Sequence, residues 1–142
     1  MCSSDLTPTF LVAAFQGFRG YDNTPVHVEL DGRPFDVTAS AIVCAIGHSL
    51  GGGIKVAHGA RQDDGLLDMV LVGDVGAKDL ALNVHRLYTG TLGDHPQITH
   101  LKGVEVTVTG DAPLQVEADG ELAGTTPATF RCLRGALRLA TA

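Results

Sequence analysis

The sequence predicts a mostly β fold, a two-sheet β-sandwich with one or two short helices. Turn dipeptides recur at short spacing, and the segments between them are rich in β-branched residues that alternate with polar ones. Only one segment has a strong helical period. A chain of 142 residues is long enough to bury a substantial hydrophobic core in one domain.

Six segments between turn signals are predicted to be strands. Their boundaries are Asp-Gly pairs and glycine clusters, which favour turns for backbone reasons. Several of the segments alternate apolar and polar positions, as a strand with one buried face does. The predicted strands are residues 26–30, 35–46, 67–72, 103–109, 114–118 and 136–140.

The strongest helical period lies between Ala77 and Tyr88. Apolar residues at i, i+4, i+7 and i+8 put one stripe on a helix that packs against a sheet. The stripe consists of Leu80, Val84, Leu87 and Tyr88. A second short helix is predicted from Phe10 to Phe18.

Two stretches, 28–32 and 116–120, share the pattern Val-Glu-x-Asp-Gly. An Asp-Gly pair tolerates the positive φ of a type I′ turn, so the repeat predicts two similar hairpins. After the turn, the first copy has Arg33 and the second has Glu121. Turn geometry therefore explains the Asp-Gly pair but does not require Glu121.

The second predicted hairpin carries three carboxylates, Glu117, Asp119 and Glu121. Crowded carboxylates repel one another, which is unfavourable unless a cation or a proton-transfer step uses them. A solvated acidic loop is the alternative interpretation.

Composition and charge exclude some function classes. The net charge of −6 disfavours a nucleic-acid partner, and no apolar run approaches the roughly 20 residues that span a bilayer. The start of the chain has no features of a signal peptide. Three cysteines without metal-ligand spacing indicate a reducing, cytoplasmic setting.

Residues 47–51 read Gly-His-Ser-Leu-Gly and fit the nucleophile elbow of a serine hydrolase, with Ser49 as the nucleophile. The acid and base would be Asp74 or Asp94 with His95 or His100. Only some forty residues precede Ser49, which leaves little room for the strands and oxyanion loop that such an enzyme needs. We therefore treat the hydrolase as an alternative.

Five groups of motifs follow one another in a characteristic order. They are Gly51-Gly52-Gly53-Ile54-Lys55; Ala60 with Asp63-Asp64-Gly65-Leu66-Leu67-Asp68; Leu87-Tyr88-Thr89-Gly90 followed by His95-Pro96; Asp119-Gly120-Glu121 followed by Gly124-Thr125-Thr126-Pro127; and Gly135-Ala136-Leu137-Arg138. With this spacing the chain resembles the C-terminal β-sandwich domain of the bacterial diacylglycerol kinase-like lipid kinases, which are also similar to sphingosine and ceramide kinases.

The resemblance implies a two-domain enzyme that transfers phosphate from ATP to a lipid hydroxyl. An N-terminal domain with a Gly-Gly-Asp-Gly-Thr loop, which this chain lacks, would hold ATP. We expect residues 7–142 to be the C-terminal domain and to be inactive alone. We expect residues 1–6 to be a non-native or disordered start, because Cys-Ser-Ser-Asp-Leu resembles a translated sequencing adapter.

The resemblance also assigns residues. Glu121 matches the family's proton acceptor, and Asp119 would lie beside it, near the nucleotide or its metal. The side chain of Asp64 and the backbone carbonyls of Arg61 and Leu66 match a structural Mg²⁺ site. A tight turn without metal remains the alternative for that loop.

The expected partners are a diacylglycerol-like lipid and ATP with Mg²⁺. The full-length protein would be cytoplasmic and peripheral to the membrane, and a homodimer is compatible with the family. Two other readings stay open. One is a free-standing, non-catalytic binding module. The other is a nucleotide acceptor, as in the NAD kinases of the same superfamily.

Overall fold

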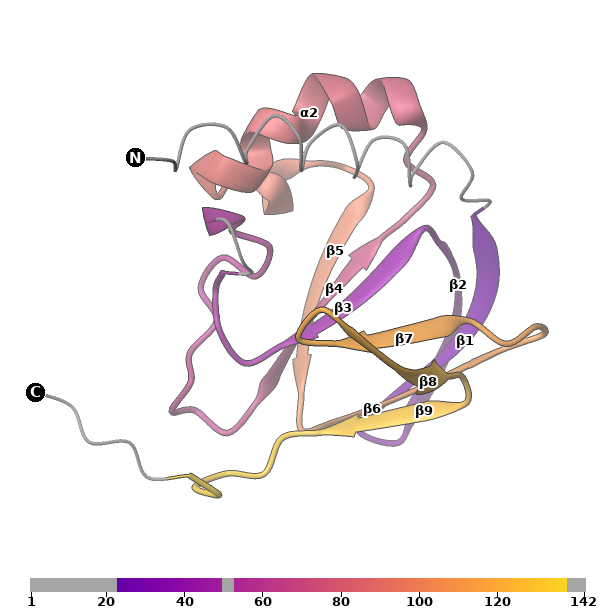
Figure 1. The fold of residues 1–142 in the computed structure, drawn as a ribbon, viewed down its shortest axis with the longest axis vertical. Coiled ribbons are helices and arrows are strands. Elements are labelled where there is room, and N and C mark those ends of the chain that lie inside the picture. Colours follow the sequence, from indigo (N-terminus) through magenta and orange to yellow (C-terminus); the bar gives the residue numbers. More distant parts are fainter. Residues whose placement is uncertain (1–22, 50–52, 138–142) are drawn as a thin grey trace, which may run out of the picture.

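The computed structural model describes residues 23–49 and 53–137 (Figure 1). Its elements are β1 (Thr24–Leu30), β2 (Arg33–Ala39), β3 (Ala41–Ala45), β4 (Leu67–Val72), α2 (Ala77–Thr89), the 3-10 helix η2 (Leu92–Asp94), β5 (Ile98–Gly103), β6 (Glu105–Gly110), β7 (Gln115–Ala118), β8 (Glu121–Thr125) and β9 (Ala128–Arg131). The predicted mostly β fold is confirmed.

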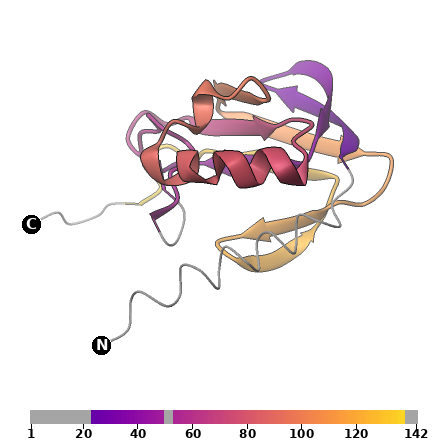
Figure 2. The same ribbon diagram turned by 90° about the horizontal axis from the view of Figure 1, so that it is seen from above.

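Two antiparallel sheets form the sandwich. The four-stranded sheet has the order β2-β1-β6-β9, and the three-stranded sheet has the order β3-β4-β5. A third sheet contains only β7 and β8, and Figure 2 shows this hairpin standing apart from the two larger sheets.

Alternating apolar residues of both sheets meet in one core. Each fully buried apolar side chain of this kind stabilises the fold by about 1.5–3 kcal/mol. The buried cluster consists of Val26, Val28, Ala39, Leu67, Met69, Leu71, Val106 and Val108. In β1 and β6 the core residues alternate with more exposed ones, so a period of two buries one face of each strand, whereas β4 is buried on both faces from Leu67 to Leu71.

The predicted strand 35–46 is wrong as one continuous element, because the chain changes sheets at Ser40. Ser40 is buried, and its backbone N–H donates to Val72 O at 2.8 Å. Its hydroxyl lies 3.2 Å from the same oxygen and 3.1 Å from Gly73 O. These bonds hold the corner between β2 and β3, which belong to different sheets.

Other strand boundaries also differ from the prediction. The predicted strands include neither β5 nor β9, and β8 is implied only by the hairpin predicted at 116–120. Ala136 and Leu137 of the predicted strand 136–140 are not in a strand. β5 was missed because His100 and Lys102 interrupt its apolar pattern. The rest of that final segment, the predicted helix 10–18 and the start at 1–6 lie outside the described residues.

The predicted helix is confirmed as α2. It ends at Gly90, whose φ of 80° is left-handed and whose N–H donates to Arg86 O at 3.0 Å. Beyond the helix, buried His95 lies with Nε2 3.1 Å from Asp79 Oδ2, which ties η2 to the first turn of α2. Within the described parts of the chain, no helix combines the length and hydropathy needed to cross a membrane.

Both predicted Asp-Gly turns are confirmed. Asp31 and Gly32 have φ of 48° and 78°, and Asp119 and Gly120 have φ of 52° and 88°. Two consecutive positive φ angles are the requirement of a type I′ turn, whose twist matches that of the flanking strands.

Asp31 does more than turn its hairpin. Its Oδ1 accepts the backbone N–H groups of Val104 and Glu105, each at 2.9 Å, and its own N–H donates to Glu105 O at 3.0 Å. Val104 is the link between β5 and β6, so this carboxylate fixes the point where the chain passes from one sheet to the other.

We predict that Asp31→Ala lowers the free energy of unfolding by about 1–2 kcal/mol more than Asp119→Ala does. Both substitutions place alanine at a left-handed position, but only the first also removes an acceptor of two backbone N–H groups. Urea denaturation of the two variants measures the difference. Equal losses would show that the Asp31 side-chain bonds contribute nothing.

Candidate functional site

The β7–β8 hairpin carries the predicted catalytic residues. Asp119 lies in the turn, Glu121 is the first residue of β8, and both are exposed. Every residue of β8 is exposed, including Leu122 at 67%. Among the described residues, neither carboxylate makes a hydrogen bond or ion pair. Both are therefore accessible to a molecule that approaches the hairpin.

The strand register separates the two glutamates of this hairpin. Glu121 pairs with Ala118, and Glu117 pairs with Leu122. Because adjacent residues in a strand point to opposite faces, Glu117 and Glu121 lie on opposite faces. The three carboxylates that the sequence places here are therefore not gathered into one cluster.

The base of the hairpin is fixed by Thr126, which is buried. Its Oγ1 accepts the N–H of Leu114 at 2.9 Å, and its own N–H donates to Leu114 O at 2.9 Å. Leu114 in turn packs against the core. The two bonds close the base of the exposed hairpin, and the packing of Leu114 connects that base to the core.

The second predicted site is the loop before β4. Asp64 Oδ1 accepts the N–H of Leu66 at 3.0 Å, which closes a turn around Gly65. Asp64 Oδ2 lies 3.5 Å from Lys102 Nζ on β5. Glycine is required at Gly65, where φ is 77°.

Asp63, the neighbouring acid, is engaged differently. Arg61 Nε donates to Asp63 Oδ1 at 3.0 Å, and its Nη2 donates to Oδ2 at 3.1 Å. These bonds lower the pKa of the Asp63 carboxyl and raise the pKa of the Arg61 guanidinium. Because both of its carboxylate oxygens accept hydrogen bonds from Arg61, Asp63 is already paired and is a poorer candidate for a metal ligand than Asp64.

The loop has the donor chemistry of a site for a hard cation. No group of three His, Cys, Asp or Glu side chains that could hold a metal occurs in residues 23–49 and 53–137, so a metal there would also need backbone oxygens. Mg²⁺ accepts such a mixed shell of one or two carboxylates, carbonyls and water. Near Asp64, the completely buried Asp68 has neither carboxylate oxygen hydrogen-bonded within the described structure. This oxygen-rich set fits Mg²⁺.

Ser49 has only part of the surroundings of a nucleophile elbow. It is exposed after β3, but the first α-helix after it among the described residues is α2. The nominated histidines have other carboxylate neighbours: His95 Nε2 lies by Asp79 and His100 Nε2 by Asp68. The structure therefore does not assemble the nominated triad.

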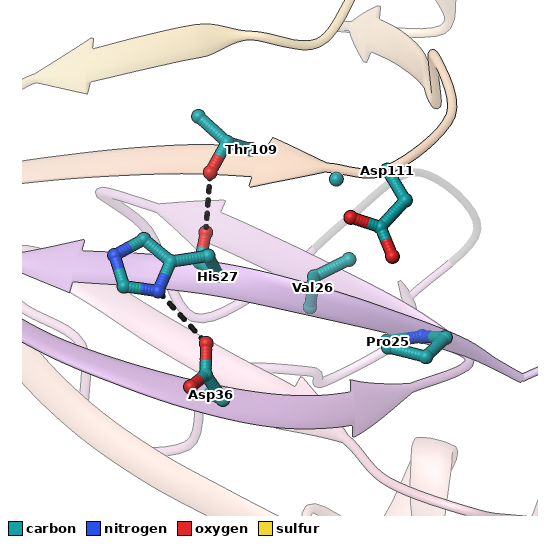
Figure 3. Close-up of a pocket in the computed structure, with 7 residues that line it drawn as sticks. Pro25, Val26, His27, Asp36, Thr109 and Asp111 are labelled. Atoms are coloured by element: carbon teal, nitrogen blue, oxygen red, sulfur yellow. Dashed lines mark hydrogen bonds and ion pairs between the residues drawn. The ribbon is translucent and has the colours of Figure 1, made fainter.

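A shallow pocket of about 240 Å³ opens elsewhere on the surface, over β1, β2 and β6 (Figure 3). His27 Nδ1 and Asp36 Oδ1 lie 2.8 Å apart at its edge, with side chains 49% and 87% exposed. None of the sequence-predicted site residues lines it. Because its lining side chains are largely exposed and include no predicted site residue, we do not assign this shallow pocket to the predicted catalytic or metal site.

Comparison with known proteins shows which family this chain resembles. The family described as "YegS C-terminal NAD kinase beta sandwich-like domain" matches residues 5–141. An uncharacterized protein of Synechocystis sp. is 31% identical over 92% of this chain and 31% of its own length. A diacylglycerol kinase of Staphylococcus carnosus is 26% identical over 79% of this chain and 37% of its own length.

Solved structures show the same fold. A candidate diacylglycerol kinase from Bacillus anthracis superposes with a TM-score of 0.71 at 22% identity, covering 89% of this chain and 44% of that one. The chain spans about a third of the length of the curated relatives that it matches.

Cys44 on β3 packs against the hydrophobic core and gives a test of its burial. Burial raises the pKa of its thiol from 9.0 to about 11. At neutral pH its thiolate fraction is therefore about 100-fold lower than that of an ordinary cysteine. We predict that iodoacetamide labels Cys44 much more slowly in the folded than in the urea-unfolded chain, with a rate that keeps rising toward pH 11. Mass spectrometry assigns the label. Equal labelling rates in the two states would contradict the burial.

Proposed function

The chain belongs to the family of YegS C-terminal NAD kinase beta sandwich-like domains, and we propose that it is the C-terminal part of an ATP-dependent lipid kinase. Relatives named diacylglycerol kinase support a diacylglycerol-like acceptor. An N-terminal domain with a Gly-Gly-Asp-Gly-Thr loop would make most of the contacts to ATP. The full-length protein would act in the cytoplasm at the membrane surface, where its lipid substrate lies.

One observation carries the proposal. The Asp119-Gly120-Glu121 hairpin has a turn with two positive φ angles and a hydrogen-bonded base, and its carboxylates are exposed. Asp119 and Glu121 have no hydrogen-bond or ion-pair partner in the described chain. Such exposed carboxylates on a defined hairpin suit a site that a second domain completes.

In the proposed reaction, Glu121 takes the proton of the lipid hydroxyl while that oxygen attacks the γ-phosphorus. A new oxygen–phosphorus bond forms, the bond from the γ-phosphorus to the β–γ bridging oxygen breaks, and ADP leaves. Asp119, two residues earlier on the turn, would lie near the nucleotide or its metal. Mg²⁺ bound with ATP would supply electrostatic stabilisation of the phosphate charge.

We propose a separate structural role for the loop before β4. The Asp64 side chain and the backbone carbonyls of Arg61 and Leu66 would hold Mg²⁺ there, away from the hairpin. The supporting observations are the turn that Leu66 N–H closes on Asp64 Oδ1 and the cationic Lys102 Nζ, which lies 3.5 Å from Asp64 Oδ2 and marks a place where positive charge is accepted.

The other candidates have less support. The family description mentions NAD kinase, which keeps a nucleotide acceptor as a second candidate. The relatives named diacylglycerol kinase favour the lipid. A non-catalytic module would leave the exposed Glu121 without a use, and a hydrolase would need the triad that the described residues do not form.

In a full-length protein that carries this domain, we predict that Glu121→Gln reduces lipid phosphorylation at least about 100-fold, because glutamine cannot accept the hydroxyl proton. Folding and ATP binding should be nearly unchanged, since Glu121 is exposed. Transfer of radiolabelled phosphate from ATP to diacylglycerol in mixed micelles measures the rate.

Glu117→Gln is the matched control, with the same chemical change on the opposite face of the same hairpin. It should retain most of the activity. Full activity in Glu121→Gln, or equal losses in both variants, would refute the assignment of the proton acceptor.

Ser49→Ala should leave kinase activity within about twofold of the wild type, because Ser49 has no assigned part in phosphoryl transfer. The same pair of proteins should be assayed on a p-nitrophenyl ester. An esterase activity that disappears in Ser49→Ala would support the hydrolase instead.

A further inference from the structure

Asp68 is a completely buried acid whose charge has to be balanced. Its side chain is 0% exposed, and neither carboxylate oxygen has a hydrogen-bond partner among the described residues. An ionised carboxylate without compensation is very unfavourable in a protein interior. Whatever cation approaches Asp68 therefore contributes strongly to the stability of the fold.

The strand register determines which side chains face Asp68. Its neighbours Leu67 and Met69 point into the core, so Asp68 points to the other face of the three-stranded sheet. On β5, Lys102 pairs directly with Asp68, and His100 pairs with Val70. Both basic side chains thus lie on the same face as Asp68.

The ammonium of Lys102 lies among three oxygens. Lys102 Nζ is 3.2 Å from Asp68 Oδ1, 3.5 Å from Asp64 Oδ2 and 3.5 Å from Gly59 O. The contact to Asp68 has an ion-pair distance without the directionality of a hydrogen bond, which suits a compact ammonium acting as a point charge. Two carboxylates and a carbonyl are also oxygen ligands that a divalent cation prefers.

Asp64 takes part both in the proposed Mg²⁺ site and in the contact with Lys102. Its Oδ1 accepts the N–H of Leu66, and its Oδ2 faces Lys102. With Lys102 in place, the charges of the two carboxylates and the ammonium sum to −1, and a divalent cation would bring the sum to +1. Without Lys102 the two carboxylates carry −2, which one divalent cation neutralises.

We infer that Lys102 is the resident cation of this loop and that Mg²⁺ competes with it for Asp64. The inference rests on the Asp64 metal site of the proposed function and adds that Lys102 makes the fold independent of that metal. Lys102 is 41% exposed, so its flexible chain has solvent into which it can withdraw when a metal binds.

Thermal unfolding of the 142-residue chain in EDTA or in millimolar MgCl₂, at matched ionic strength, tests the competition. The wild-type melting temperature should change by less than about 2 °C between the two buffers. Lys102→Met should melt about 10 °C lower than the wild type in EDTA, because it removes the ammonium beside buried Asp68 and leaves only His100 Nε2 near Asp68 Oδ1, at 3.4 Å. Mg²⁺ should restore at least about half of that loss.

Two further variants separate charge from packing. Lys55→Met makes the same chemical change beside Gly90, outside the cluster, and its melting temperature should not respond to Mg²⁺. Asp64→Asn combined with Lys102→Met removes the proposed metal ligand as well as its competing ammonium, and should abolish the response to Mg²⁺. If Lys102→Met does not fold in EDTA, recovery of its near-UV circular dichroism on adding Mg²⁺ is the equivalent readout.

The outcomes distinguish the inference from its premise. A wild-type chain that is strongly stabilised by Mg²⁺ would overturn the competition while keeping the metal site. Absence of any Mg²⁺ response in both the wild type and Lys102→Met, including failure of the variant to fold in either buffer, would overturn the competition and the metal site together. Neither result bears on Glu121.

Discussion

A buried carboxylate requires a nearby positive charge, and Asp68 imposes this requirement on the centre of the three-stranded sheet. The requirement accounts for the polar face of β5, where His100 and Lys102 both reach Asp68 Oδ1. The loop before β4 places a second carboxylate, that of Asp64, 3.5 Å from the same Lys102 ammonium. Removing one partner of a buried ion pair is strongly destabilising, whereas apolar replacement of both is often neutral. We therefore propose a cation-binding role for this cluster beside its role in stability.

The two Asp-Gly hairpins share a local sequence but differ in what surrounds them. Both turns have the same backbone geometry, so the difference lies in their surroundings. Asp31 is bonded to the link between the sheets and fixes the sandwich. Asp119 stands on an exposed hairpin, where the same turn holds Glu121 at a defined place in solvent. The same turn therefore has a structural contact at Asp31 and none at Asp119 within the described chain.

Much of the fold could be predicted from local sequence. β1, β4, α2 and both turns were found because alternation, helical period and Asp-Gly chemistry are local signals. The corner at Ser40 was missed, since its bonds to Val72 and Gly73 are long-range. β5 was missed because Lys102 and His100 look like surface residues until Asp68 is placed opposite them. The site residues came from family motifs, whereas the cluster around Asp68 is visible only in three dimensions.

The central claim is that this sandwich belongs to an enzyme that phosphorylates a lipid. Its most direct test is to incubate a full-length protein that carries this domain with radiolabelled ATP, Mg²⁺, diacylglycerol micelles and NAD together, and to identify the labelled product by thin-layer chromatography. The account predicts label in a lipid phosphate. Label in NADP, or in no product while ATP still binds, would contradict it.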